Sequence, residues 1–549
     1  MDEPASAPVV SERRKWGSLI VLSLALAIII IDTTLLNVSL STIIKDLHTD
    51  LQKIQWVITA YSLMLAAFTI TGGRMGDLFG RKRMFMLGAV LFAVGSLTAS
   101  NSHSFSTLLI GESIIEGIGA ALMMPATSSL LVATFHGRER AIAFGVWGAI
   151  AAASSAIGPI LGGWLTTNYS WRWGFRINVV VVAILLLSSF LIAESRERGK
   201  KLTLDWVGVI LSSLGMLGIV FGFIESTTYG WWTAKSNFIT FGHSITFGTL
   251  SVTPISIALG IIFLALFAAW ELWREERGLT PLVSMIMLEN PAFVSGTITT
   301  AVISLGQMGI LFTFPVFMQS VLGLDAFHTG LAFIPLSLAI LIVSPSMAAL
   351  SHRIAPKRII QAGLLLSFCA TLVLRWSLNP AGSVWQLTPG FALFGAGMGM
   401  VMSQINNITL SAVNAQQAGE ASGVNNTMRQ LGSTLGAAII GAVLLSSIPA
   451  NITKQINLSG AIPNQAKAAI TQSITKQGAN AEFGGGAQAA DPRTPVVIRE
   501  AITTAVHQGT ADANAAALLY AAVFSLLGLA VSTYLPSKVG VHGAPSSGH

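Results

Sequence analysis

The sequence predicts an all-α polytopic membrane protein with about fourteen transmembrane helices. Three observations lead to this prediction: an apolar composition, recurrent long apolar segments, and an uneven distribution of lysine and arginine. Of the 549 residues, 52% are hydrophobic and 10% are charged, whereas soluble domains average about 25% charged residues. A soluble interior could not bury so much apolar surface, and a bilayer removes that limit.

Apolar stretches long enough to span a bilayer recur along the whole chain. Internal prolines and glycines are compatible with such spans, because neighbouring helices in a membrane bundle satisfy the freed backbone groups. The predicted helices cover residues 17–43, 54–74, 84–102, 106–133, 141–166, 175–194, 205–226, 254–273, 292–319, 327–350, 359–377, 385–409, 424–448 and 514–534.

The basic residues test the number and orientation of these helices. With a cytoplasmic N-terminus, the cytoplasmic segments hold 20 of the 31 lysines and arginines, including Arg429 at the inner end of helix 424–448. The outer side holds 11, of which five lie in the long loop 449–513, and long loops count little in the positive-inside rule. Both termini are therefore predicted to be cytoplasmic.

A weak internal repeat predicts the domain organisation. The segments GRMGDLFGRKR (73–83) and AALSHRIAPKR (348–358) are both short basic loops that open a helix, and repeated halves are a common transporter plan. The long segment 449–513 is predicted to cap the outer face, partly as short helices and partly disordered, or to be a passive exposed loop. The units are a cytoplasmic tail 1–16, a six-helix bundle 17–194, a linker 195–204, two inserted helices 205–273, a linker 274–291, a second six-helix bundle 292–534 that includes loop 449–513, and a cytoplasmic tail 535–549.

Several classes of protein are disfavoured by what the sequence lacks. The single cysteine, Cys369, permits no intrachain disulfide and no cysteine metal cluster. The sequence contains no Walker loop, no nucleophile elbow and no His/Cys/Asp cluster with metal-ligand spacing. We therefore expect no catalytic residue, no metal, no cofactor and no ATP-driven pump. The net charge of +7 is assigned to cytoplasmic loops rather than to nucleic-acid binding.

The loop 73–83 is the most specific local motif. Its glycines permit a tight turn, and an acid lies among four bases; the alternative is an ordinary positive-inside loop. The motif resembles the signature loop of the major facilitator superfamily, which implies the major facilitator fold and a latch that stabilises the outward-open state. The latch residues would be Gly73, Arg74, Asp77, Gly80, Arg81, Lys82 and Arg83.

Helix 17–43 contains an aspartate, Asp32, within an apolar span, and such a residue is functional by default. The segment IDTTLLNVSL resembles the D-x-T-x-x-N-V-A-L-P motif of the fourteen-helix drug:proton antiporter branch, the EmrB/QacA-like proteins. Thr34 and Asn37 fall in register, while Ser39 and Ser41 replace alanine and proline. A structural aspartate bonded to a neighbouring helix is the alternative.

Three further segments are similar to the same branch. IGPILGGWL resembles the G-P-x-x-G-G motif of exporters, carried here by Gly158, Pro159, Gly162 and Gly163; a generic packing motif is the alternative. WRWGFRINV (171–179) and GEASGVNNTMRQLG (419–432) also match, although Val180 stands where proline is usual.

Helix 106–133 departs from the branch pattern R-x-x-Q-G-x-G. Ser113 replaces the arginine and Glu116 replaces the glutamine, and Glu112 lies one turn earlier. Residues four apart share one helix face, and two carboxylates in a low-dielectric cavity should not both ionise readily. The pair is a candidate for proton coupling. The alternative is that the glutamates face a water-filled vestibule or polar neighbours.

The remaining candidate positions are weaker. Glu225, near the outer end of helix 205–226, is a further proton-coupling candidate or a headgroup-zone residue. Polar and adaptable apolar side chains within the spans could line a substrate cavity, although ordinary packing is equally compatible with them. These cavity candidates are Asn37, Gln307, Met308, Phe312, Phe314, Asn406 and Asn407.

Taken together, the resemblance implies secondary active efflux of amphiphilic or cationic organic compounds in exchange for protons, in a bacterial plasma membrane. The proton gradient would supply the energy without a cofactor. The expected partners are small organic substrates, protons and the bilayer, with no nucleic acid; a monomer is expected, and a periplasmic adaptor is left open. The alternatives are a dedicated exporter of one metabolite, lipid or peptide-like product, and a transport-inactive sensor.

Overall fold

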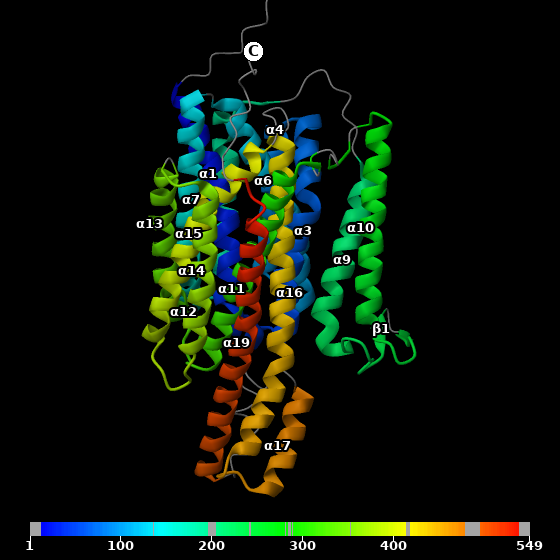
Figure 1. The fold of residues 1–549 in the computed structure, drawn as a ribbon, viewed down its shortest axis with the longest axis vertical. Coiled ribbons are helices and arrows are strands. Elements are labelled where there is room, and N and C mark those ends of the chain that lie inside the picture. The colour runs from blue at the N-terminus through cyan, green and yellow to red at the C-terminus, as the bar shows by residue number, and fades with distance from the viewer. Residues whose placement is uncertain are drawn as a thin grey trace, which may run out of the picture.

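The computed structural model describes residues 12–536 except 136, 196–204, 241–242, 280, 284–286, 288, 352, 413–417 and 478–494. The described chain is almost entirely helical (Figure 1). Its first part comprises α1 (Glu12–Val38), α2 (Leu40–Asp46), α3 (Leu51–Phe79), α4 (Arg81–Ser100), α5 (Phe105–Leu108), the π-helix η1 (Leu109–Glu116), α6 (Gly117–Thr134), α7 (Gly137–Asn168), α8 (Arg172–Leu187) and the 3₁₀-helix η2 (Ser188–Leu191).

The second part contains an inserted pair and a second group of helices. The inserted pair is α9 (Trp206–Tyr229) and α10 (Val252–Glu276), joined through strands β1 (Phe238–Thr240) and β2 (His243–Ile245). The second group comprises α11 (Pro291–Ser320), α12 (Ala326–Ala332), α13 (Ile334–Leu350), α14 (Pro356–Trp376), η4 (Val384–Leu387), α15 (Thr388–Ser411), α16 (Ala418–Leu458), α17 (Asn464–Gln477) and α19 (Val496–Ser532).

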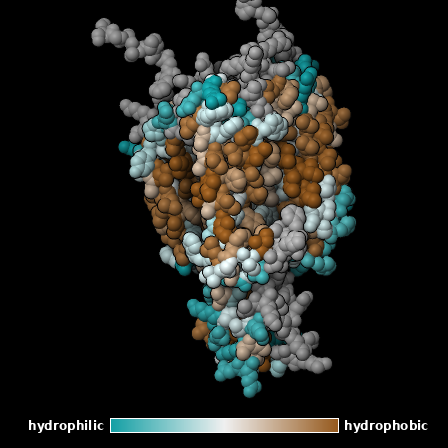
Figure 2. All heavy atoms as spheres, turned by 90° about the vertical axis from the view of Figure 1, so that its right-hand side faces the viewer, coloured by the Kyte–Doolittle hydropathy of each residue, from teal (hydrophilic) through white to brown (hydrophobic). Residues whose placement is uncertain are grey.

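The structure confirms a polytopic membrane protein. Within the described ranges, eleven helical segments are long and apolar enough to cross a bilayer. Helices α3, α7 and α15, of 29, 32 and 24 residues, occupy the positions of the three other predicted spans. On the face shown in Figure 2, an apolar belt crosses the body between hydrophilic surfaces. The count of fourteen crossings and the cytoplasmic termini stay predictions, although α1 begins and α19 ends at the same end of the body (Figure 1).

The inserted pair stands beside the main body (Figure 1). Helices α9 and α10 pack chiefly on each other, and α9 also contacts α3 and α16. Strands β1 and β2, between these two helices, pair antiparallel, with Phe238 opposite Ile245 and Thr240 opposite His243. The pair therefore adds to the fold from outside rather than dividing the two bundles.

The segment 449–513 differs from its prediction as a cap. Helices α16 and α19, of 41 and 37 residues, continue beyond the apolar belt and pack with α17 into a projecting bundle (Figures 1 and 2). Its core consists of the buried residues Ile452, Ile456, Ile462, Ile474 and Ile502. These isoleucines join the three helices; short helices were expected here, but the polar Ala/Gln-rich remainder hid the continuation of α16 and α19 from the sequence analysis. We refer to this side of the molecule as the α17 end.

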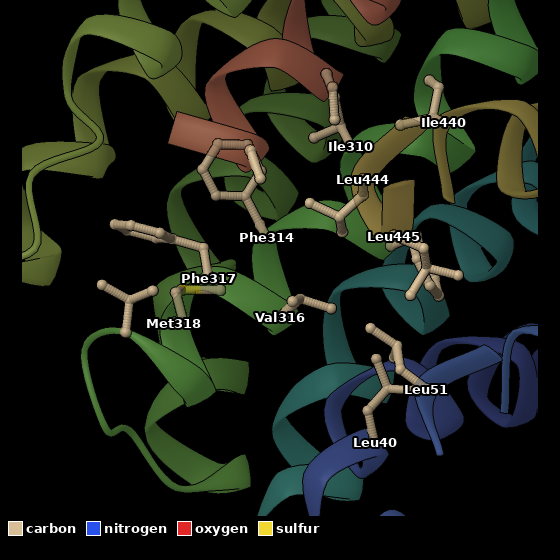
Figure 3. Close-up of a cluster of buried hydrophobic side chains, with 14 of the residues drawn as sticks. Leu40, Leu51, Ile310, Phe314, Val316, Phe317, Met318, Ile440, Leu444 and Leu445 are labelled. Atoms are coloured by element: carbon tan, nitrogen blue, oxygen red, sulfur yellow. The ribbon is translucent and has the colours of Figure 1, made fainter. Parts of the chain in front are cut away.

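An apolar cluster joins the two groups of helices toward the α17 end of the body (Figure 3). All of its side chains are buried and several are fully inaccessible, so the cluster closes the space between α2 and α3 on one side and α11 and α16 on the other. We call this cluster the apolar seal; it consists of Leu40, Leu51, Ile310, Phe314, Val316, Phe317, Met318, Ile440, Leu444 and Leu445.

Helix α7 contacts both groups of helices through its G-P-x-x-G-G segment. A Cβ added at Gly158 would lie 1.9 Å from Thr34 Oγ1, and one added at Gly162 would lie 2.7 Å from Leu35 Cγ, both on α1. On the other side, a Cβ added at Gly163 would lie 2.3 Å from the carbonyl oxygen of Ala326 on α12. The glycines are therefore required for close approach of backbones.

We predict that Gly163→Ala destabilises the protein, because the new methyl group meets backbone atoms that cannot move aside. Overpacking of this kind costs about 1–3 kcal/mol, so the melting temperature in detergent should fall by several degrees. Gly423→Ala is the matched control, since a Cβ there meets nothing within 4 Å. Equal melting temperatures for the two variants would contradict the tight α7–α12 contact.

A polar junction fastens α2 to the start of α8. Arg172 forms an ion pair with Asp46 and donates from Nη2 to the carbonyl of Ser102 over 2.7 Å. Trp171 Nε1 donates to Asp46 Oδ2 over 3.0 Å. Partial burial acts to raise the pKa of Asp46, but the hydrogen bonds from Arg172 and Trp171 outweigh it, so the pKa lies below its usual value.

This junction predicts a pH-dependent stability. Because the folded-state pKa of Asp46 is depressed, its contribution is present above the unfolded-state pKa, about 3.9, and is lost as pH falls through the folded-state pKa. Asp46→Asn should therefore lower the melting temperature at pH 7, and the difference from the parent protein should vanish in strong acid. A difference that stayed constant with pH would show that the carboxylate charge does not matter.

Candidate functional site

Three acids from distant parts of the sequence meet inside the first group of helices. Asp32 comes from α1, and Glu112 and Glu116 come from η1. Their side chains are 1%, 2% and 0% exposed, and one carboxylate oxygen of each lies within 4.8 Å of the others. The structure thus brings together three of the four proton-coupling candidates, which we call the carboxyl cluster.

The local fold of η1 places the two glutamates. Residues Leu109–Glu116 form a π-helix, a form that is rare and frequent at functional sites. Glycines let this segment press against α4: a Cβ added at Gly95 would lie 2.5 Å from the backbone nitrogen of Glu116, and one added at Gly111 would lie 2.6 Å from that of Ala99. Close backbone contact on this side directs both carboxyl groups into the bundle.

Asn178 of α8 holds the carboxyl cluster together. Its Nδ2 donates to Asp32 Oδ1 over 2.6 Å and to Glu116 Oε1 over 3.0 Å, and it lies 3.1 Å from Ser96 Oγ. Ser96 Oγ of α4 in turn donates to Glu116 Oε1 over 2.6 Å. One amide and one hydroxyl thus connect α1, α4, η1 and α8 at a single point.

Several oxygens of the carboxyl cluster are free to accept further hydrogen bonds or to bind a cation. Among the described residues, Asp32 Oδ2, Glu112 Oε2, Glu116 Oε2 and the hydroxyl of the buried Tyr61 have no hydrogen-bond partner. Three negative charges in so small and dry a volume would repel strongly, so the site requires positive charge, as protons or as a cation. Its oxygens are close enough together to share either. Sequence spacing missed this cation-compatible geometry because the ligands come from two separate helices.

Ser113 stands where the branch pattern has an arginine, and its side chain makes a structural contact. Ser113, fully buried, donates from Oγ to the carbonyl of Val57 on α3 over 2.8 Å. It therefore fastens η1 to α3 and brings no positive charge to the carboxyl cluster. Glu225, by contrast, lies away from the cluster and accepts from Trp56 Nε1 over 2.8 Å and Gln52 Nε2 over 3.2 Å, which attaches α9 to α3.

The latch loop forms a tight turn with several backbone anchors. Gly80 has φ +107°, a conformation that requires glycine, and separates α3 from α4. Arg74 Nη2 donates to the carbonyl of Pro281 over 2.7 Å, beyond α10. The backbone nitrogen of Lys82 donates to Glu194 Oε1 over 3.0 Å.

Two further latch residues, Arg81 and Gly73, contact neighbouring segments. The backbone nitrogen of Arg81 donates to the carbonyl of Ser195 over 3.0 Å. Gly73 lies close to Pro125, because a Cβ added at Gly73 would lie 3.6 Å from the Cβ of Pro125. Arg83 is exposed. The side chain of Asp77 lies outside the described part of the structure, so its predicted charge cluster is not visible.

The predicted substrate-cavity residues do not converge on one surface. Phe314 belongs to the apolar seal, Phe312 is buried in the same core, and Met308 packs against it. Gln307 lines a small cavity within the second group of helices, and Asn37 donates back to its own helix at the Thr33 carbonyl over 2.9 Å. The side chains of Asn406 and Asn407 lie outside the described part. Sequence periodicity identified interior positions but not which interior surface they face.

Two contributors to the site escaped the sequence analysis. Asn178 and Ser96 are uncharged residues in apolar helices, and such residues are common in packing. A signal for Asn178 was nonetheless present, because it is the asparagine of the WRWGFRINV segment. Ser96 carries no comparable signal.

Comparison with known proteins adds a family relationship. The Major Facilitator Superfamily profile matches residues 22–437. The multidrug resistance protein Stp of Mycobacterium tuberculosis is 28% identical over 538 residues, covering 97% of this chain and 95% of that protein. The puromycin resistance protein pur8 of Streptomyces alboniger is 32% identical, covering 78% and 82%. The multidrug efflux pump LfrA of Mycolicibacterium smegmatis is 29% identical, covering 94% and 96%.

Solved structures show the same fold at low sequence identity. A bacterial homologue of the human lysosomal transporter Spinster, in an inward-facing and unoccupied conformation, superposes with a TM-score of 0.58 at 15% identity, covering 95% of this chain and 98% of that chain. A structure from a study of proton-dependent oligopeptide transporters gives a TM-score of 0.54 at 13% identity, covering 94% and 99%.

We predict that Asn178→Leu destabilises the protein by removing the donor shared by Asp32 and Glu116. Leaving buried acceptors unsatisfied costs about 1–3 kcal/mol, which should lower the melting temperature in detergent. Asn168→Leu is the control, because Asn168 is exposed and donates only to the Trp164 carbonyl of its own helix. If both variants melted alike, Asn178 would not be the central hydrogen-bond donor.

Proposed function

This chain belongs to the Major Facilitator Superfamily, and on that premise we propose that it exports organic compounds across the plasma membrane in exchange for protons. The observation that carries the proton part of this proposal is the carboxyl cluster. Three buried carboxyl groups with unpartnered oxygens form a site whose charge must change with its occupancy. A site of that kind can bind and release protons during transport.

The proposed cycle uses the carboxyl cluster as a charge switch. With protons bound, the cluster is close to neutral and suits a dry bundle interior; without them, it requires solvent or another cation. Conformations that hydrate Asp32 and the two glutamates differently will therefore differ in proton affinity. A proton can drive the transporter between them only by that difference in affinity.

The cargo side of the proposal draws on the relatives. Their names include multidrug resistance, puromycin resistance and multidrug efflux, which supports export of amphiphilic or cationic drugs. The proton gradient is the proposed energy source, and the proposal needs neither a catalytic residue nor a cofactor. We place the protein in a bacterial cytoplasmic membrane, acting as a monomer, with the projecting α17 end as the part that an adaptor would meet.

A second candidate function is a dedicated exporter of one metabolite, lipid or peptide-like product. Ser113 in place of the branch arginine and the projecting bundle are the two departures from the branch pattern that leave room for this function. A broad panel of toxic compounds separates the two, because a dedicated exporter protects cells expressing it against few of them or none.

We predict that Asp32→Asn and Glu116→Gln abolish proton-driven transport. Each variant removes one titrating carboxyl group while keeping the side-chain shape, so the carboxyl cluster can no longer change its charge fully. In inverted membrane vesicles energised by a pH gradient, dye uptake should fall at least tenfold, while exchange of dye without a gradient should continue.

The control for this experiment is Glu500→Gln, an exposed acid at the α17 end, which should leave uptake unchanged. Full gradient-driven uptake by Asp32→Asn would show that the carboxyl cluster is not the coupling site. Uptake by the parent protein that ignored the gradient would show that the exchange is not with protons.

A further inference from the structure

Arg429 of α16 is a charged residue that neither the carboxyl cluster nor the latch uses. It lies about three turns inside α16, which begins at Ala418, and not at the helix end where the sequence analysis placed it. Its side chain is partly buried, and its Nε is inaccessible and has no hydrogen-bond partner among the described residues. A guanidinium in such a place is costly unless an anion reaches it.

The helix period places Arg429 on the surface of α16 that faces the space between the two groups of helices. Positions 429, 433, 440 and 444 lie within about 60° of one another around the axis. Ile440 packs against Gly309 of α11, and Leu444 belongs to the apolar seal (Figure 3). Arg429 therefore lies along the same path, on the side of the seal away from the α17 end.

No acid of the second group of helices is placed to neutralise it. From residue 292 to residue 448 the sequence contains two acids, Asp325 and Glu420. Asp325 caps α12 and is partly exposed. Glu420 precedes Arg429 by nine positions, which is two and a half turns and puts the two residues on opposite sides of the helix.

The buried acids elsewhere in the described part of the chain are hydrogen-bonded to other partners, although the carboxyl cluster and Glu271 keep oxygens that have no partner. The carboxyl cluster is bound by Asn178 within the first group of helices. Glu271 of α10 accepts from the backbone nitrogens of Leu282 and Val283 over 2.6 and 3.3 Å. Asp205 accepts from the Gly208 nitrogen and Trp270.

We propose that Arg429 binds an anionic group, a carboxylate in the first instance, on the transported compound. A guanidinium presents paired donors that match the two oxygens of a carboxylate, and such charge-assisted pairs are strong in a desolvated site. The inference rests on the proposed export function and narrows its cargo. The favoured substrates carry a carboxylate on an apolar body, in addition to or in place of a cationic group.

The test compares an anionic and a cationic dye in the same inverted vesicles. Fluorescein carries a carboxylate and ethidium carries a fixed positive charge. Arg429→Gln should reduce fluorescein uptake at least tenfold and leave ethidium uptake within twofold of the parent protein. Arg429→Lys should restore part of the fluorescein uptake, because it keeps the charge and loses the paired donors. Lys467→Gln, a partly exposed position on α17, should change neither.

A binding measurement makes the test independent of transport. Fluorescence anisotropy of fluorescein with purified full-length protein should give a dissociation constant at least tenfold higher for Arg429→Gln, with an unchanged size-exclusion profile. Equal fluorescein binding by parent and variant would overturn the inference, as would an equal loss of both dyes. If the parent protein bound fluorescein through Arg429 but transported neither dye, the proposed export function would fail and the anion site would stand.

Discussion

The structure depends most on the requirement that buried charge be neutralised. Asp32, Glu112 and Glu116 lie where water does not reach, and the carboxyl cluster persists only because donors and positive charge compensate it. Asn178 and Ser96 supply the donors and tie four helices to one point. The first group of helices is thus organised around the carboxyl cluster. The protons or cations bound there can change, while the hydrogen bonds from Asn178 and Ser96 keep the helices in place.

Charge is divided between the two groups of helices. Acids gather in the first, and an arginine faces the shared space from the second, with the apolar seal closing that space toward the α17 end. The glycines of α7 hold the two groups in backbone contact beside the seal. Under the proposed export mechanism, this division would let a proton and an organic ion bind to separate surfaces, so that neither has to displace the other directly. Coupling would then run through the packing between the two groups.

Much of the fold could be predicted from the sequence, because long apolar runs in a membrane protein leave few alternatives to helices. Asp32 and the Glu112–Glu116 pair were identifiable as acids in apolar spans. Their meeting was not, since it depends on how α1 packs beside η1 across some eighty residues of chain. Phe312 and Phe314 were assigned to a cavity and lie in the core around the seal, because helical periodicity separates interior from lipid without distinguishing one interior surface from another. Short helices were expected in part of 449–513, but the continuation of α16 and α19 into this segment was hidden by a polar composition that a small three-helix bundle tolerates.

The projecting bundle has a mechanical consequence. Helix α19 runs through the body to the tip without a proline in its sequence, and α16, which contains Pro449, runs alongside it. Helix α19 therefore forms a lever arm attached to the second group of helices. At 1.5 Å per residue, about 20 residues beyond the belt make an arm of roughly 30 Å, so a tilt of about 10° moves its tip by about 5 Å. The position of the α17 end, outside the bilayer, therefore changes with the conformation of the helices that lie within the bilayer.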